Sequence, residues 1–260
     1  MHLTYDIVAL LMAAALVAGI IDAMAGGGGL ITIPALLAAG VPPVMALGTG
    51  KLQSACGTAC AAYAFWRGGR IDLARFRGPA IAAFVGSIGG AALVQMIDSQ
   101  FLAGLLPLLL VAMAGYFLFG PRLSEVDTHT RLAPIGLLSA IGAIGAYDGF
   151  FGPGTGSFYT LLLVSAAGFG VTRAVAHAKL LNLASNLAGF AMLLAGGHVL
   201  WIVGIAMAVA SVIGNQIGAV LAIRFGGRAI RPLLVAISLA LTVKLVADPA
   251  NPLRAWLGWG

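Results

Sequence analysis

Apolar stretches of about 20 residues, the length that a helix needs to cross the hydrocarbon core of a bilayer, recur from Ile7 to Ala247 with only brief polar gaps. The chain is 61% apolar and 8% charged, whereas soluble domains are about a quarter charged. This pattern predicts an all-α polytopic membrane protein, embedded in the lipid bilayer and without a soluble domain of useful size.

Gaps and Gly or Pro positions divide the chain into ten helical segments, five on each side of one hydrophilic connection. The connection defines a first transmembrane repeat (1–120), a cytoplasmic connector (121–131) and a second transmembrane repeat (132–260). The second segment of each repeat is too short to span alone. Each repeat therefore has five crossings with broken or tilted members, or three crossings plus a re-entrant pair. We expect helices over residues 6–24, 30–39, 44–66, 77–97, 101–119, 133–149, 156–168, 172–194, 201–222 and 229–247.

The two halves match in sequence at a constant offset, after a two-residue slip at the glycine-rich stretch. Lys51 matches Lys179, and 179 − 51 gives the offset of 128 residues. A register kept over so long a span indicates an internal duplication. Four glycines keep the same register, and we interpret them as helix-packing positions: Gly86 and Gly90, matched by Gly214 and Gly218.

Positive charge is distributed oppositely over equivalent gaps of the halves. The gap after the third segment is rich in arginine only in the first half, with Arg67, Arg70, Arg75 and Arg77. The gap after the fourth segment is rich only in the second half, with Arg224, Arg228 and Arg231. Short loops rich in Lys and Arg stay cytoplasmic. The halves are therefore predicted to be two inverted-topology repeats, with both termini outside and the connector inside.

Each repeat contains a glycine-rich break that follows an aspartate: Asp22 precedes Gly26–Gly29, and Asp148 precedes Gly152–Gly156. Unpaired backbone is tolerated at membrane depth only where it lines a cavity or is buried in protein. Free N–H groups at helix N-termini attract anions, and inverted-repeat transporters place broken helices at the substrate site. Close helix packing is the alternative. We predict an anion site at the breaks, formed by Gly26, Gly27, Gly28, Gly29, Gly152, Gly154, Thr155 and Gly156.

A lysine heads a polar stripe in the third segment of each repeat. Residues at i+3 and i+7 share its helix face, giving Lys51, Ser54 and Thr58 in one repeat and Lys179, Asn182 and Asn186 in the other. An ammonium inside the bilayer costs on the order of 3 kcal/mol, so such a lysine is a functional candidate, although it can also snorkel to the interface. We predict substrate-binding roles for Lys51, Ser54, Lys179, Asn182 and Asn186.

Three further residues are predicted to act in coupling or helix capping: Asp22, Asp148 and His177. Each aspartate ends a segment, where it caps the broken helix, pairs with a lysine or carries a proton. His177 lies two residues before Lys179 and matches Thr49 in the first half. A purely local contact is therefore the alternative for this histidine.

No cofactor or metal site is predicted. The stretch that ends in Gly50-Lys51 fails as a P-loop, because Met45 replaces its first glycine and Leu52 its Ser or Thr. The formal charge of +6 is carried mostly by arginine in the gaps, which is typical of a topology signal. We therefore expect no nucleic-acid partner.

Four motifs resemble the TauE/SafE family of sulfite exporters and related anion permeases: Gly19–Pro34, Ala46–Ser54, Tyr147–Gly156 and Ala176–Asn186. The resemblance covers nearly the whole chain. It implies a bacterial inner-membrane (plasma-membrane) transporter for small sulfur-containing or carboxylate anions.

The leading hypothesis is a secondary transporter, not an enzyme, that moves sulfite, an organosulfonate or a similar small anion by alternating access, with a proton or sodium ion as a candidate coupling ion. A passive anion channel would use the same cationic lining. An intramembrane aspartyl protease, in which Asp22 and Asp148 share one proton, is a remote alternative. Neither aspartate lies in a Gly-x-Gly-Asp arrangement, which disfavours the protease.

Overall fold

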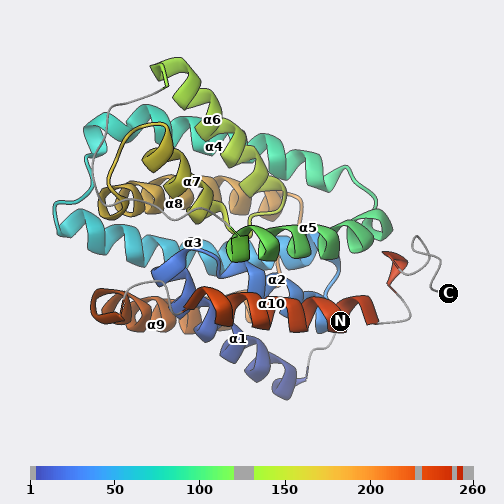
Figure 1. The fold of residues 1–260 in the computed structure, drawn as a ribbon. Helices are drawn as coiled ribbons and strands as arrows, with labels where there is room; N and C mark the ends of the chain where they lie inside the picture. Colours follow the sequence, from blue (N-terminus) through green and yellow to red (C-terminus); the bar gives the residue numbers. More distant parts are fainter. Residues whose placement is uncertain (1–3, 120–131, 226–229, 248–250, 254–260) are drawn as a thin grey trace.

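The computed structural model describes residues 4–119, 132–225, 230–247 and 251–253, and every regular element in these ranges is helical (Figure 1). The predicted connector 121–131, the chain ends and the side chains of Arg224, Arg228 and Arg231 lie outside the described residues. The helices are α1 (Tyr5–Ala25), α2 (Gly29–Ala38), α3 (Pro43–Arg67), α4 (Leu73–Gln95), α5 (Ser99–Phe119), α6 (Pro134–Phe150), α7 (Thr155–Ser165), α8 (Val171–Ala195), α9 (Trp201–Phe225) and α10 (Ile230–Ala247).

Five of these helices are long and apolar enough to cross a membrane: α1, α4, α5, α8 and α9. The predicted class, an all-α polytopic membrane protein, is therefore confirmed. The predicted segments are close to the observed helices, and the largest difference is that α4 begins four residues early. Its N-cap residue explains this, since Asp72 Oδ1 accepts a hydrogen bond from the Arg75 backbone N–H at 3.0 Å.

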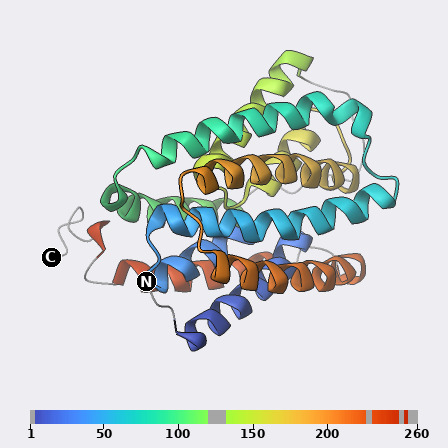
Figure 2. The same cartoon turned by 180° about the vertical axis from the view of Figure 1, so that it is seen from behind.

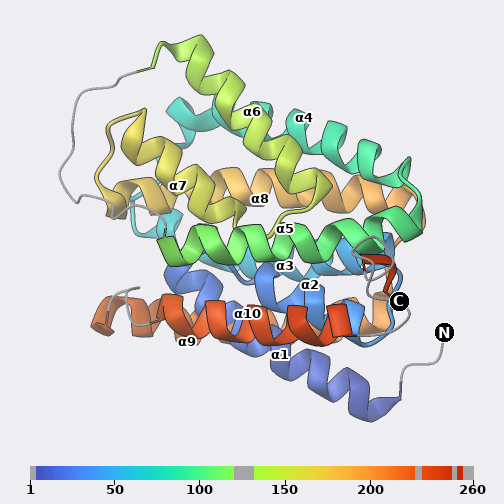
Figure 3. The same ribbon diagram turned by 45° about the vertical axis from the view of Figure 1, so that its right-hand side comes forward.

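Two helices, α2 and α7, have only 10 and 11 residues. At 1.5 Å per residue each is roughly 15–17 Å long, about half of the hydrocarbon thickness. Each begins within a glycine break, and Gly154 at the N-cap of α7 has a φ of +84°, which glycine adopts without strain. The broken-helix prediction is thus confirmed in both halves. Figure 3 shows α5 and α10, which contact each other, running side by side across the near face.

Four long helices lie side by side in the order α4, α8, α3, α9 (Figure 2). At the two edges of this layer, α6 packs on α4 and α1 packs on α9 (Figure 1). Each helix has a counterpart five positions along the chain, so that α4 corresponds to α9 and α8 to α3. Exchanging all counterparts leaves this set of packing partners unchanged.

The two edge contacts are close because glycines lie where the helices cross. A Cβ at Gly90 of α4 would overlap the carbonyl oxygen of Ala146 in α6, and a Cβ at Gly218 of α9 would overlap that of Ile20 in α1. Both crossings thus bring one helix against the backbone of the other. The predicted packing role of these glycines is confirmed.

We expect Gly90→Ala to destabilise the protein by about 1–3 kcal/mol, because an added methyl group in a close-packed contact forces the backbones apart. Gly89 is the matched control, since a Cβ there meets no atom within 4 Å. Unfolding in detergent, followed by intrinsic fluorescence, measures the difference. Equal stability of the two variants would show that the crossing tolerates a larger separation.

Candidate functional site

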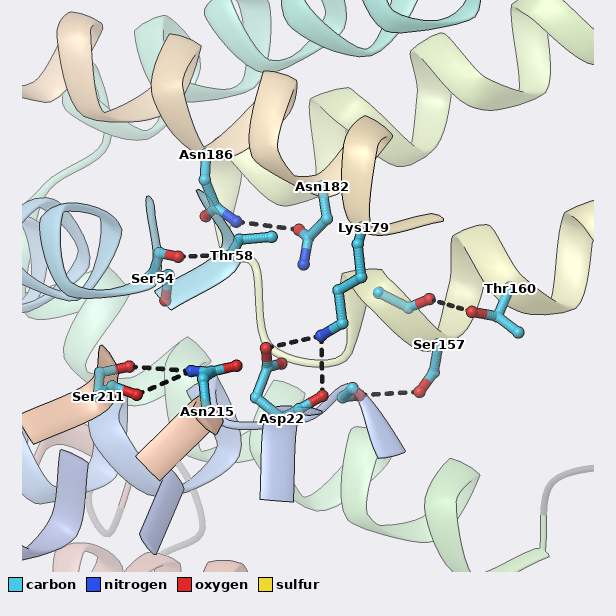
Figure 4. Close-up of polar contacts among 12 residues, drawn as sticks. Asp22, Ser54, Thr58, Ser157, Thr160, Lys179, Asn182, Asn186, Ser211 and Asn215 are labelled. Atoms are coloured by element: carbon cyan, nitrogen blue, oxygen red, sulfur yellow. Dashed lines mark hydrogen bonds and ion pairs between the residues drawn. The ribbon is translucent and has the colours of Figure 1, made fainter. Parts of the chain in front are cut away.

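The two glycine breaks meet at the centre of the fold and line one cavity of about 40 Å³. Ser157 Oγ, just after the second break, donates a 2.8 Å hydrogen bond to the Gly26 carbonyl oxygen in the first break (Figure 4). A cavity of this size exceeds the space that one water molecule needs. It is lined by Asp22, Gly26, Gly27, Gly28, Gly29, Thr32, Ile33, Leu47, Gly50, Lys51, Gln53, Ser54, Thr58, Asp148, Phe151, Gly152, Pro153, Gly154, Thr155, Gly156, Asn182, Asn186, Ser211 and Asn215.

The lysine of α3 pairs with the aspartate of α6. Lys51 Nζ lies 2.7 Å from Asp148 Oδ1, and the two side chains are 5% and 2% exposed. Gly152 makes room for this pair, because a Cβ there would lie 3.0 Å from both charged atoms. The pair therefore holds α3 against the end of α6.

The lysine of α8 pairs with the aspartate of α1. Lys179 Nζ lies 2.9 Å from Asp22 Oδ2 and also donates to the Asp22 carbonyl oxygen at 2.8 Å (Figure 4). The Asp22 side chain is 21% exposed, so this pair is less buried than the first. Because each ammonium is matched by a carboxylate, the two pairs together carry no net charge.

A chain of amides links the first ion pair to the cavity. Lys51 Nζ donates to Asn186 Oδ1 at 3.2 Å. Asn186 Nδ2 in turn donates to Asn182 Oδ1 at 3.0 Å (Figure 4). An ammonium can only donate, so it fixes the orientation of both amides. Among the described residues, Asn182 Nδ2 has no acceptor. This nitrogen lies beside the second glycine break, since a Cβ built on Gly156 would be 3.4 Å from it.

The glycine breaks contribute backbone N–H groups. The N–H of Gly26 bonds to the Asp22 carbonyl oxygen at 2.9 Å, which closes the last turn of α1. No hydrogen bond among the described residues uses the N–H groups of Gly27, Gly28 or Gly29, or those of Gly152 and Gly154. Thr155 Oγ1 donates to the Gly152 carbonyl oxygen at 2.7 Å, so its hydroxyl hydrogen stabilises the break itself.

Two of the predicted residues do not line the cavity. Lys179 reaches it only through Asp22. His177 lies away from it, with its ring 4.0 Å from that of Phe76 between centroids. Its Nε2 accepts from the backbone N–H of Asp72 at 3.2 Å, and its Nδ1 lies 2.8 Å from the Arg173 carbonyl oxygen. His177 thus binds the start of α4.

The two aspartates that a protease dyad would require have different partners in the structure. Asp22 binds Lys179 and Asp148 binds Lys51, so each carboxylate is paired with its own lysine.

Five polar residues line the cavity but were not predicted as site residues: Thr32, Gln53, Thr58, Ser211 and Asn215. Ser211 and Asn215 lie four residues apart on α9, and Gln53 Nε2 donates to Ser211 Oγ at 2.8 Å. Polar side chains on one face of an otherwise apolar segment were the available signal.

A buried, charge-paired cavity between two broken helices of a polytopic membrane protein is the arrangement of a membrane transporter. The chain belongs to the family described as Sulfite exporter TauE/SafE, whose sequence profile matches residues 11–245. The resemblance noted from the motifs is therefore confirmed.

Several relatives carry names of the same class. The chain is 45% identical over 257 residues, 98% of each chain, to the "Probable membrane transporter protein ORF9" of a Sinorhizobium species. It is 45% identical over 250 residues to a "Probable membrane transporter protein" of Haemophilus influenzae, covering 95% of this chain and 98% of the relative. It is 42% identical over 247 residues to YfcA of Escherichia coli K12, covering 94% and 91%. No solved structure matches the chain.

Proposed function

We propose that the protein is a secondary transporter that moves a small anion, such as sulfite, an organosulfonate or a small carboxylate, across the bacterial inner membrane. The observation that carries this proposal is the single cavity in which both glycine breaks meet. Unused backbone N–H groups of the breaks and Asn182 Nδ2 provide hydrogen-bond donors there. Donors of this kind replace the water around an anion.

The lysines add positive potential without leaving a net charge. Each ammonium has three hydrogens, and both Lys51 and Lys179 use two of them on described partners. The third hydrogen of Lys51, which lines the cavity, is available to the substrate. The paired aspartates spare the protein the cost of two isolated buried charges.

We further propose that the two halves are inverted repeats, with both termini outside, and that they alternate access by rocking against each other. Two observations support this. The six principal helix pairs (α4·α6, α1·α9, α4·α8, α3·α9, α3·α8 and α5·α10) are unchanged when counterparts are exchanged, and each ion pair joins one half of the chain to the other. Rocking would therefore strain or break both pairs, which makes the aspartates candidates for binding the coupling ion, a proton or sodium.

Purified protein in vesicles tests this function. Uptake of sulfite, methanesulfonate or acetate should saturate, and anion loaded on the opposite side should accelerate it. Imposed pH or sodium gradients should drive net uptake if one of these ions is coupled. Uptake that rises linearly with concentration and shows no counter-transport would identify a passive channel, and the absence of flux for all three anions would refute an anion site.

We expect Asn182→Leu to reduce anion flux by about 10- to 100-fold, because a hydrogen bond to a charged group is worth roughly 1.5–3 kcal/mol. Leucine has nearly the shape of asparagine but cannot donate. Gln216→Leu is the control, since this amide is exposed on α9. Equal flux in the two variants would show that Asn182 does not bind the anion.

A further inference from the structure

The cavity has acceptors as well as donors, and the acceptors lie on α9 and the facing side of α3. Asn215 Nδ2 donates to the Ser211 carbonyl oxygen at 3.0 Å. A carbonyl oxygen only accepts, so this bond fixes the Asn215 amide with Oδ1 pointing away from Ser211 (Figure 4). Asn215 is 3% exposed, and its Oδ1 has no hydrogen-bond partner among the described residues.

Gln53 on α3 carries a second amide oxygen without a partner, and here the amide is held by a hydroxyl, not by a carbonyl oxygen. Its Nε2 is bound to Ser211 Oγ at 2.8 Å, and its Oε1 is buried without a partner in the described part of the chain. Gln53 and Asn215 thus share Ser211 as a common partner, and both line the cavity. A buried acceptor without a donor is costly, so a ligand that supplies a hydrogen would be favoured here.

An anion without any hydrogen to donate fits this side of the cavity poorly, because its oxygen atoms would face other acceptor oxygens. The nitrogen donors of the lining belong to other residues, namely Lys51, Asn182 and the glycine breaks. The charge of the lining also limits which anion fits. Its two ion pairs cancel, and the desolvation cost of an ion rises with the square of its charge, so a monoanion is favoured over a dianion.

We propose that the site selects the monoprotonated form of a small oxyanion, such as hydrogensulfite or hydrogencarbonate. Its charged oxygens accept from Asn182 Nδ2 and the glycine N–H groups, and its remaining acidic hydrogen is donated to Asn215 Oδ1 or Gln53 Oε1. This inference rests on the proposed function, since it names the protonation state of the anion that the same cavity takes.

Binding to the unmodified protein tests the proposal with two ligands of the same size. Methanesulfinate carries a methyl group where hydrogensulfite carries its hydroxyl, and it stays a monoanion around neutral pH. We expect hydrogensulfite to bind about 10- to 100-fold more tightly, as expected when a buried acceptor is left unpaired. Calorimetry in detergent measures both constants.

The pH dependence separates the ligand from the protein. The charged groups that face the site are Asp22 on α1, Lys51 on α3 and Asp148 on α6, and Lys179 on α8 contacts it through Asp22. The lining residues from α2, α7 and α9 are uncharged. Titration of any of these groups would alter the binding of both ligands. Above the second pKa of sulfurous acid, the Kd for total sulfite should rise by about tenfold per pH unit while that for methanesulfinate stays level.

Three outcomes are distinguishable. If neither ligand binds, the proposed anion site fails. If both bind with equal strength, or if sulfite affinity stays constant across its pKa, the anion site stands and selection of the protonated form is refuted. Asn215→Leu and, separately, Gln53→Leu should lower the preference for hydrogensulfite over methanesulfinate by about tenfold, and an unchanged preference in both folded variants would also refute it.

Discussion

Replacement of Lys51 by methionine is expected to destabilise the protein by about 3–5 kcal/mol, the usual effect of removing one partner of a buried ion pair. The Asp148 side chain is only 2% exposed, and its Oδ2 already lacks a hydrogen-bond partner among the described residues. Without Lys51, the carboxylate would be a buried charge with no cation beside it. Thermal unfolding in detergent measures the loss.

Two controls show whether charge is the cause. Lys244→Met removes an equivalent ammonium from an exposed position near the end of α10 and should change stability little. The double variant Lys51→Met/Asp148→Asn removes both charges and should recover most of the stability of the parent protein. A double variant as unstable as Lys51→Met alone would show that packing of the lysine stem, not charge pairing, is what stabilises this position.

The helices and their breaks follow from local signals in the sequence. Hydrophobic length and glycine clusters act within a few residues, and they located α1 to α10 closely. The boundary of α4 was missed because a capping bond decides it: Asp72 extends the helix back into a stretch that the arginines made look like a loop.

The partners of the charged residues depend on the fold. Pairing of the aspartates with lysines was one of several hypotheses, but the partners are 157 and 97 positions apart in the chain (179 − 22 and 148 − 51). Only the packing of the helices shows that each pair joins the N-terminal half of the chain to the C-terminal half. The position of His177 also depends on the fold. Two residues along a helix is about 200° around its axis, so His177 points away from the side that carries Lys179.

The acceptor side of the cavity was missed because it is not duplicated. At the offset of 128 residues, Gln53 corresponds to Leu181 and Asn215 to Ser87. A search for repeated polar stripes therefore finds the donors of α8 but not these amides. Asymmetry of this kind is informative, since a site formed by two similar halves needs unlike residues to distinguish the two ends of its ligand.

Replacement of Lys179 by methionine is expected to abolish most anion flux while leaving a folded protein. Asp22 is 21% exposed, so its carboxylate keeps some access to water and the loss of its partner destabilises the fold less than the corresponding change at Lys51. The carboxylate also lines the cavity, which would then carry a net negative charge. The Asp22 carboxylate and an anion about 6 Å away, at an effective dielectric constant near 20, repel each other by about 3 kcal/mol. This repulsion corresponds to a roughly 100-fold loss of anion affinity.

The double variant Asp22→Asn/Lys179→Met distinguishes neutralisation from direct binding. If Lys179 acts by cancelling the charge of Asp22, removing both charges restores a neutral lining, and flux should recover by at least tenfold over Lys179→Met. The two variants are compared by their anion flux in vesicles. Each must first be shown to be monodisperse and to have a Tm near that of the parent protein. A double variant as inactive as Lys179→Met would contradict charge cancellation and would require the ammonium itself at the anion, which places the substrate on the Asp22 side of the cavity in the transporting state.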